Sequence, residues 1–557
     1  MANLNTESSL MELPEVNLPR YLHRYTIRRH TTSNVGDIQT IYINTLIMPG
    51  ETVRMSLRQF WKMTTSLFPS MDTLHADIYA FADNYVNLWD HAKEFFGEDL
   101  DNPQEVAPEY TIPEIVIQPT DTIEPDDLLN FIAVPYMTAD PTRNNITIDR
   151  LGYNHYCNMY NWFFRDQNYI AKIPFSKGDE SINKSDLKVQ KCLKAARNHD
   201  YFMGTPAPQK GAPETIPLAT EIPVIGNGQA LTLICGNTPE HEAFSISGYS
   251  VYANKGTAIT RTPTLNTAQN VGDQRNEVFM TGNRILGLNT TIGQSGVIAD
   301  ATNALAATLN ALRISIVRQQ LKEQLLFYGG RINEVIRSQY GVTPPEGIIQ
   351  QTELLGAKRI DLNMDTVLQT SETSGNSPLG DSAGYSTTFD EDFLFEKSFT
   401  FWSVLSVVAV VRQEHSYAQG LAQQHMKRRK YDFYNPAFEG LGMQPRKKAE
   451  IYLTGHDTDN DIWNFAPAWQ EYRFEVGRST GYMAPQVPNS LAYYTYTDHY
   501  DTVPNSGEEW INETPIYVDR TLVVSSEKAP QFICDFAFDI DRINLVPNFV
   551  LPGIDKI

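Results

Sequence analysis

Alternating apolar and polar positions give the clearest strand signals near the start of the chain. Residues 41–47 and 53–57 each alternate with a period of two, on either side of a Met48-Pro49-Gly50 turn. This is the pattern of a half-buried antiparallel pair. A third run at 74–82 places Leu74, Ala76, Ile78 and Ala80 on one face. We therefore expect three β-strands within the first 85 residues.

The C-terminal end repeats this alternation. Residues 532–540 carry Phe532, Cys534, Phe536, Phe538 and Ile540 on one face and aspartates on the other. A core strand so late in the chain has to pair with a distant segment, so both ends are expected to form one sheet system. The apolar, β-branched stretch 393–411 predicts one long or two consecutive central strands buried on both faces. The pattern favours one large β-sandwich with insertions over a string of domains.

Helices are a minority. Leucine, isoleucine and valine recur every three or four residues across 305–325, and Gly329-Gly330 then ends the helix. A shorter helix is expected at 331–340, before Gly341, and further helices at 147–165 and 85–96.

Two long stretches read as connections between strands. Residues 98–142 contain eleven acidic residues and no lysine or arginine, which predicts an acidic extended loop. Residues 212–310 have few charges and are rich in threonine, glycine, alanine and asparagine. An insertion this long in a compact fold is usually functional or an assembly feature.

The formal net charge of −21 limits what this protein binds unaided. A chain this acidic repels a phosphate backbone on average, so nucleic-acid contact requires a local basic patch or a separate basic partner. The four cysteines lie far apart and are expected to be small buried apolar residues in a reducing compartment. No signal peptide is visible, and the longest apolar run is too short for a bilayer. These features predict a soluble protein of cytosolic origin.

Several segments together resemble the major capsid protein of microviruses, closest to the gokushovirus branch. They occur in the family's order, and the matching sequences are LFPSMDTLHADIYAF (67–81), NLWDHAKEFFGE (87–98), YNWFFRDQN (160–168), RNHDYFMGTPAPQKG (197–211), ISIVRQQLKEQLLFYGGRINEVIRSQYGV (314–342), RRKYDFYNPAFEGLGMQP (428–445), AWQEYRFEVGRSTGY (468–482) and FAFDIDRINLVPNFVLPGI (536–554). Each block is moderately specific alone, whereas the ordered set is strong. Residues 98–142 and 212–310 show no match.

The resemblance implies a mainly β fold, an eight-stranded antiparallel viral jelly roll with long inter-strand insertions, covering residues 1–557 as a single coat domain. Sixty copies would form a T=1 icosahedral shell around circular single-stranded DNA. Residues 212–310 are then the candidate for a surface protrusion at the three-fold axes, with a role in host attachment.

The resemblance also implies the partners. These are further copies of the chain, the enclosed single-stranded DNA, a small basic DNA-binding and packaging protein, pilot and scaffolding proteins during assembly, and a host surface receptor, with no membrane partner. The expected location is the virion, assembled in the host cytoplasm. The charge of −21 agrees with a separate genome-neutralising protein.

Two basic sets are candidates for DNA contact. The first combines Lys427, Arg428, Arg429 and Lys430 with Arg446, Lys447 and Lys448, and aromatic residues lie between them. The alternative for this set is an inter-subunit salt-bridge patch facing acidic loops of a neighbour, which is favoured because YDFYNPAF resembles packed core. The second set is Arg20, Arg24, Arg28 and Arg29, in an arm ahead of the first strand.

Other motifs are weaker. Asp457, Asp459 and Asp461 are spaced like the start of a calcium loop, but Ile462 and Ala468 stand where glycine and glutamate are needed, which favours a solvated turn and no metal. No cofactor is expected. No metalloprotease, nucleophile-elbow or phosphate-loop motif is present, so the chain is predicted not to be an enzyme. The alternative function is a carbohydrate-binding or glycoside-hydrolase β-sandwich, since acidity and aromatic richness also suit sugar binding.

Overall fold

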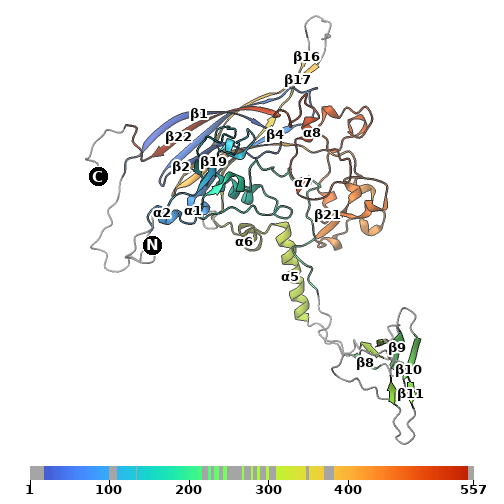
Figure 1. Ribbon diagram of the computed structural model, residues 1–557. Coiled ribbons are helices and arrows are strands. Elements are labelled where there is room, and N and C mark those ends of the chain that lie inside the picture. Colours follow the sequence, from blue (N-terminus) through green and yellow to red (C-terminus); the bar gives the residue numbers. More distant parts are fainter. Residues whose placement is uncertain are drawn as a thin grey trace, which may run out of the picture. The chain divides into compact units, whose positions relative to one another are not determined.

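Two four-stranded antiparallel sheets form the centre of the larger of two compact units, which comprises residues 1–210 and 322–557 (Figure 1). The computed structural model describes residues 18–98, 110–132, 134–215, 309–345, 351–368, 370 and 382–549, together with seven short strands between residues 224 and 299. In the first sheet the strands lie in the order β1 (Tyr21–Ser33), β22 (Phe532–Asn544), β3 (Thr52–Met63) and β18 (Thr387–Ser398). In the second the order is β15 (Glu353–Leu362), β4 (Leu74–Asn84), β19 (Ser403–Gln413) and β2 (Gln39–Ile47).

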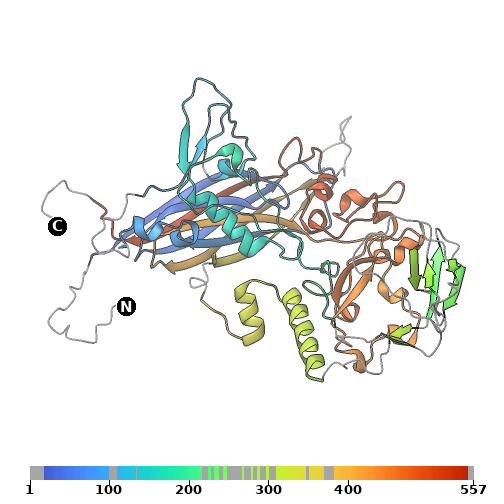
Figure 2. The ribbon, with the colours of Figure 1, turned by 60° about the horizontal axis from the view of Figure 1, so that its bottom comes forward.

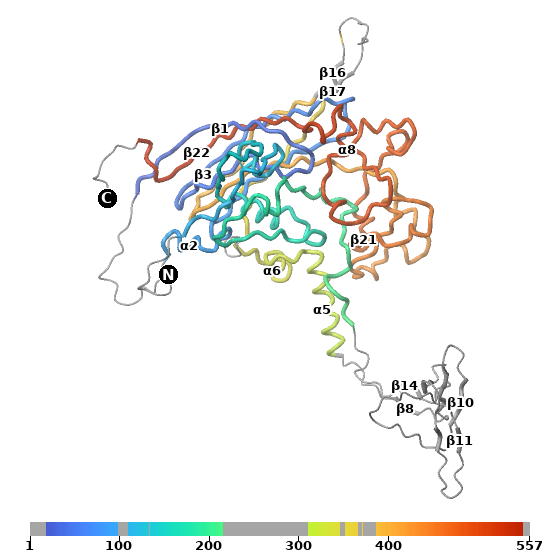
Figure 3. Tube along the Cα trace, viewed as in Figure 1, coloured from blue at the N-terminus to red at the C-terminus, as the bar shows by residue number. Residues whose placement is uncertain are grey.

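The two ends of the chain meet in the first sheet, as the alternation predicted. Strand β1 pairs with β22 from Tyr21↔Asn544 through Ser33↔Phe532, and β22 pairs with β3 on its other side. Figure 3 shows the blue β1 beside the red β22. The expected fold class, a mainly β jelly-roll sandwich with few helices and long insertions, is therefore confirmed.

One core lies between the sheets. The inward-facing residues of β3, β4, β19 and β22 meet there, including all five apolar residues of the 532–540 alternation. Trp61 is 1% exposed and sits edge-on to Phe536, with ring centroids 5.3 Å apart, and to Phe532 at 6.2 Å. Edge-to-face aromatic packing of this kind adds to the stabilisation from area burial.

The predicted pairing of residues 41–47 with 53–57 is wrong. Strand β2 pairs with β19 in one sheet, whereas β3 pairs with β22 and β18 in the other. The turn at Gly50 carries the chain between sheets, and Gly50 N–H donates to the Phe399 carbonyl (2.7 Å) on the link between β18 and β19. Strands β2 and β3 face the same core from opposite sheets. Each therefore alternates apolar and polar residues, just as two strands paired in one sheet would.

Residues 393–411 form two strands that differ in burial. Every residue of β19 is buried, because its sheet is covered on both faces. Strand β18 instead lies at a sheet edge and exposes Phe389 and Phe393. The expectation of burial on both faces therefore holds only for β19.

Described residues between 110 and 195, which follow β4 in the chain, cover the outer face of the second sheet (Figure 2). Helix α4 (Leu151–Met159) continues as a π-helical turn (Tyr160–Phe164) and packs with Phe81, Val408 and Val410 of the sheet. The expected helix at 85–96 is two single turns, α1 (Tyr85–Leu88) and α2 (Ala92–Phe95). The two other predicted helices are present as α5 (Leu309–Phe327) and α6 (Ile332–Tyr340).

Part of the acidic stretch 98–142 contributes to this cover. Residues 99–109 lie outside the described residues, but β5 (Glu114–Ile117) and α3 (Leu128–Phe131) are ordered, with Ile115, Ile123 and Leu128 buried. Outside residues 211–321, and apart from single 3-10 turns, the structure has a few further short elements. These are the helices α7 (Glu508–Ile511) and α8 (Ile516–Asp519) and the strands β6 (Ile146–Asp149), β7 (Ile182–Asn183), β16 (Asp365–Leu368), β17 (Ser382–Tyr385), β20 (Met443–Lys447) and β21 (Ile462–Pro467).

Residues 211–321 form a second compact unit. Most of the 212–310 insertion lies outside the described residues. The strands that are described form small antiparallel sheets and are β8 (Val224–Gly226), β9 (Leu231–Gly236), β10 (Glu242–Ile246), β11 (Asn266–Ala268), β12 (Glu277–Phe279), β13 (Ile285–Leu288) and β14 (Val297–Ala299).

Candidate assembly and genome-contact surfaces

Lys427 is enclosed by its neighbours. Its Nζ lies 2.6 Å from Glu471 Oε1 and 4.3 and 5.3 Å from the ring centroids of Tyr472 and Trp469. Only 7% of the side chain is exposed. A cation held by a carboxylate and aromatic faces stabilises the loop around it, so Lys427 is not placed to meet a phosphate.

The residues that follow Lys427 are exposed. Arg428, Arg429 and Lys430 point their charges outward, while the Asp432 carboxylate accepts the backbone N–H groups of Arg428 (2.9 Å) and Arg429 (2.7 Å). These two backbone hydrogen bonds hold the pKa of Asp432 below its usual value. The expectation that the YDFYNPAF stretch is packed core is wrong, since the side chain of Tyr431 is 71% exposed and that of Phe433 is 51% exposed.

Arg446 lies in the interior. It is 3% exposed, and its guanidinium lies 4.1 Å from the ring centroid of Tyr201 and 2.5 Å from Gln470 Oε1. Burial lowers the pKa of Arg446 despite nearby acidic groups. Its role in this structure is to stack within the protein.

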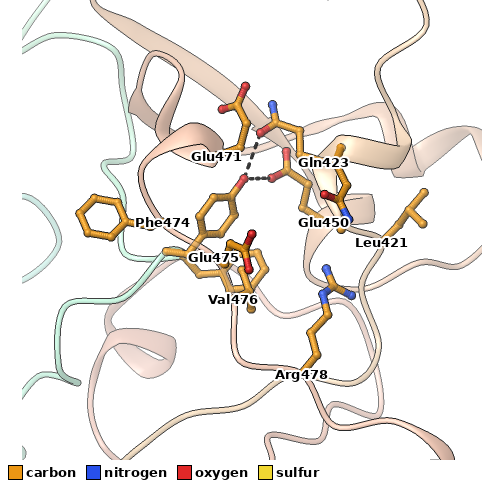
Figure 4. Close-up of a pocket in the computed structure, with 12 residues that line it drawn as sticks. Leu421, Gln423, Glu450, Glu471, Phe474, Glu475, Val476 and Arg478 are labelled. Carbon is orange, nitrogen blue, oxygen red and sulfur yellow. Dashed lines mark hydrogen bonds between the residues drawn. The ribbon is translucent and has the colours of Figure 1, made fainter. Parts of the chain in front are cut away.

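A small acidic cavity of about 160 Å³ lies beside Arg446 and is lined by Glu450, Glu471 and Glu475 (Figure 4). The dashed lines in Figure 4 run from the Tyr201 hydroxyl, which lies 3.0 Å from Gln423 Oε1 and 2.9 Å from Glu450 Oε2 and donates its single proton to one or the other. Burial raises the pKa of Glu450, although Arg446, the backbone N–H of Lys447 and the Tyr201 hydroxyl act in the opposite direction.

The last two lysines of the first basic set contact the acidic turn at 457–461. Lys448 Nζ lies 3.0 Å from Asp461 Oδ2, and Lys447 Nζ donates to Asn460 at 3.0 Å. Asp459 instead accepts hydrogen bonds from Thr454 and from the backbone of Gly455 (2.7 Å), while Asp457 is exposed. One ion pair, Lys448–Asp461, thus joins two candidate sites that the sequence presented separately.

The second basic set was expected in an arm ahead of the first strand, and this placement is wrong, because Arg24, Arg28 and Arg29 lie on β1 itself. Arg24 forms an ion pair with Asp541 (2.7 Å), Arg28 is exposed, and Arg29 is half-buried. Arg20 precedes the strand and is exposed. Arg24 and Arg28 share the outer face of the β1–β22–β3–β18 sheet, which alternates with the buried core face.

On that outer sheet face, charged side chains of neighbouring strands pair with one another. Asp539 of β22 accepts two hydrogen bonds from Arg58 of β3 (3.0 and 2.9 Å). Arg54 lies over the ring of the exposed Phe393 (5.4 Å to the centroid). Within the described residues, Arg28 and Lys62 have no carboxylate partner.

Comparison with known proteins accounts for nearly the whole chain. Residues 12–554 match the family described as "Capsid protein (F protein)". The chain belongs to this family. It is 30% identical over 559 aligned residues to "Capsid protein VP1" of Bdellovibrio phage phiMH2K, covering 99% of each chain. It is 31% identical to "Capsid protein VP1" of Spiroplasma virus 4, covering 94% of this chain and 93% of that protein.

A third relative, "Capsid protein VP1" of Chlamydia phage 1, is 25% identical over 92% of each chain. The resemblance to gokushovirus-like microvirus capsid proteins is therefore confirmed, and the chain is a virion capsid protein and a structural non-enzyme. Nothing supports the carbohydrate-active alternative. Among the helices that the structure describes, none combines the length and apolarity needed to cross a bilayer.

The capsid protein nevertheless contains a serine–histidine–aspartate arrangement that the sequence did not reveal. His155 Nε2 lies 2.6 Å from Ser406 Oγ, and His155 Nδ1 lies 2.8 Å from Asp83 Oδ2. All three residues are at most 2% exposed. A hydrolase triad needs its hydroxyl open to a substrate, whereas here the hydrogen bonds join helix α4 to strands β4 and β19 inside the protein.

A second interior group is also composed of residues that are distant in sequence. Arg197 Nη1 lies 2.5 Å from Asp498, and His415 bridges Asp498 (2.8 Å) and Glu513 (3.2 Å). Each of these side chains is at most 2% exposed. No local spacing marks either group, because their members come from segments up to about three hundred residues apart.

Proposed function

We propose that this capsid protein builds a T=1 shell of sixty copies around circular single-stranded DNA, with the outer face of the β1–β22–β3–β18 sheet toward the genome. The observation that carries the proposal is the difference between the two sheets. The β15–β4–β19–β2 sheet is covered by its own insertion, whereas the other sheet leaves an open face within the described residues. An uncovered face of a shell subunit is available to what the shell contains.

The side chains of the open face suit single-stranded nucleic acid. Arg28 and Lys62 are free to contact phosphates, and the exposed rings of Phe389 and Phe393 offer stacking surfaces for bases. The face also carries carboxylates, most of them already paired with arginine or histidine. Since the whole chain carries −21, we propose that a small basic protein supplies most of the genome neutralisation.

Reversing the charge of the open face is expected to reduce the packaged DNA without preventing shell formation. Particles of the Arg28→Glu/Lys62→Glu variant should retain less nuclease-resistant DNA and release it at lower salt, because phosphate contacts depend on counterion release. The matched control reverses Lys172 and Lys188, two exposed lysines outside this sheet. Equal DNA content and equal salt sensitivity in all three particles would place the genome elsewhere, and image reconstruction of the particles tests the sixty-copy shell.

We further propose that the insertion at residues 212–310 forms the protrusion at the three-fold axes and takes part in host attachment. Its length supports this role, together with its separation as a compact unit of the chain. Particles whose insertion is shortened within 247–265 should still form and retain DNA but adsorb to host cells at least about tenfold less. Unchanged adsorption by intact particles would contradict the attachment role.

A further inference from the structure

An exposed aromatic surface surrounds the enclosed Lys427, and we name it the aromatic shelf. Phe433 and Tyr472 lie over Lys427, and Tyr434 lies beside Tyr472 with ring centroids 6.0 Å apart. Tyr431 precedes them on the same loop as Phe433, packs against Phe438 (6.1 Å between centroids) and completes the set of four. Each is at least 45% exposed. Monomeric proteins rarely leave large rings grouped in this way, so a contiguous exposed aromatic cluster indicates a binding surface.

Contacts with buried neighbours hold the shelf side chains in place. Tyr434 packs edge-on against the buried Trp469 (centroids 5.6 Å apart, 82° between planes), and its backbone N–H donates to the Tyr472 hydroxyl at 3.2 Å. Lys427 lies under Phe433 and Tyr472 and is neutralised by Glu471. Side chains that are already ordered lose little conformational entropy on binding, which favours a tight contact.

Three exposed cations, Arg428, Arg429 and Lys430, lie at the edge of the shelf, although the chain as a whole is acidic. Asp432 offsets part of the charge of Arg429, whereas no ion pair of Arg428 or Lys430 is found within the described residues. Tyrosine, phenylalanine and arginine are the residues enriched at the centres of protein interfaces. The neighbouring shelf rings of Tyr434 and Tyr472 are tilted by 55° with centroids 6.0 Å apart, unlike the parallel faces on which successive bases stack.

A complementary surface lies on the described part of the acidic stretch, residues 121–140. Glu124, Asp126 and Asp140 are exposed there, and Tyr136 is 57% exposed beside them. Asp126 forms an ion pair with Lys191 (2.5 Å), but both side chains are more than half exposed, so water screens this pair and it is weak. The segment is ordered by its buried apolar residues and carries no lysine or arginine. The segment therefore presents exposed carboxylates and the ring of Tyr136 on an ordered backbone.

These two surfaces do not meet within one chain. Across the part of the chain that the structure describes, no hydrogen bond or ion pair joins the shelf residues to residues 121–140, and Figure 2 shows the two segments, teal and orange, apart from each other. The capsid protein family assembles as shells, so many copies bring unlike surfaces of the same chain together. We propose that the aromatic shelf binds the acidic segment 121–140 of a second copy of this chain.

Charge reversal and its repair test this interface. Coat chains are expressed with the other genes of the virus, and particles are separated from free chains by sedimentation. The Arg428→Glu/Arg429→Glu/Lys430→Glu variant is expected to yield at least about tenfold fewer particles than the wild type. Adding Glu124→Lys and Asp126→Lys to the same chain should restore most of the yield, because the interface charges are then exchanged.

A second variant tests the apolar part of the interface. Tyr431→Ser/Tyr434→Ser should also reduce the particle yield at least about tenfold, while thermal unfolding of the free chain stays close to that of the wild type. The matched charge control is Lys93→Glu/Lys172→Glu/Lys528→Glu, which reverses three exposed lysines outside both surfaces and should assemble normally.

Three outcomes would overturn the proposal. The first is normal assembly of the charge-reversed or serine-substituted chain. The second is a charge-exchanged chain that is folded yet unrepaired, which would assign the shelf a different partner. The third is normal particles with reduced DNA, which would make the shelf a nucleic-acid surface. Failure of the wild-type chain itself to form sixty-copy shells would instead contradict the proposed function.

Discussion

Replacing Trp61 with alanine is expected to destabilise the free capsid protein by about 3–5 kcal/mol, the range for removing a fully buried tryptophan from a packed core. Trp61 is 1% exposed between the sheets, and its indole is edge-on to both Phe532 and Phe536 of β22. The change leaves a cavity where the N- and C-terminal strands meet. It therefore weakens the contact that joins the two ends of the chain.

Urea unfolding of the free chain measures this loss, and the yield of particles measures its consequence. Trp61→Phe serves as the control, because it keeps most of the ring volume and loses only the indole N–H bond to Gln59 (3.0 Å). We expect its cost to be well below that of alanine. If Trp61→Ala unfolds within about 1 kcal/mol of the wild type, the core between the sheets is not the main source of stability.

Alternation in the sequence located β2, β3, β4 and β22, but it missed β1 and gave the wrong partners for β2 and β3. Alternation in residues 41–47 and 53–57 marks residues that face a common core, and this is equally true of two paired strands and of two strands stacked in opposite sheets. The partner of β22 could be inferred only in general terms, since pairing between the ends followed from the lack of any other nearby strand. The individual register, such as Ile27 opposite Phe538, depends on contacts across the whole fold.

The candidate site residues show a similar limit. Lys427 and Arg428 are adjacent in a basic run, yet one is enclosed by Glu471 and aromatic rings and the other is exposed. From the sequence alone, both residues are cations that could contact a phosphate. What separates them is a carboxylate forty-four residues away, which no local pattern identifies.

The buried groups were missed because their residues are individually unremarkable in sequence. Asp83, His155 and Ser406 converge only after two strands and a helix are in place. Spacing rules detect sites built from one segment, whereas three distant segments form this one. The same reasoning applies to the larger ionic group around Asp498.

Removing the Asp498 carboxylate is expected to cost about 3–5 kcal/mol, because it leaves buried charged partners without compensation. Asp498 accepts from Arg197 at 2.5 Å, from His415 at 2.8 Å and from the Tyr500 hydroxyl at 2.7 Å. Burial by itself would raise the pKa of Asp498, but Arg197 and His415 hold it well below its usual value. Asp498→Asn keeps the shape and removes the charge, so unfolding of this variant isolates the ionic contribution.

The same group predicts how stability changes in alkaline solution. Burial and Arg197 both lower the pKa of His415, yet Asp498 and Glu513 outweigh them and raise it to about 9. A folded-state pKa above the unfolded value of about 6.5 means that the protonated ring contributes stability fully below pH 6.5. That contribution declines above pH 6.5 and is lost as the pH rises through about 9. A tenfold difference in proton affinity between the folded and unfolded chain corresponds to about 1.4 kcal/mol, so the rise in pKa from 6.5 to about 9 corresponds to a loss of at most about 3–4 kcal/mol.

Unfolding measured from pH 6 to pH 10 tests this prediction. The wild-type chain should lose stability across that range, whereas His415→Gln, which has no titrating ring, should start less stable and show a flatter profile. Glu513→Gln is the intermediate case, because Asp498 still raises the pKa of His415, and its loss should occur at a lower pH. Parallel profiles for the wild type and His415→Gln would mean that the ring is neutral in the folded protein, and that Arg197 alone compensates the buried Asp498.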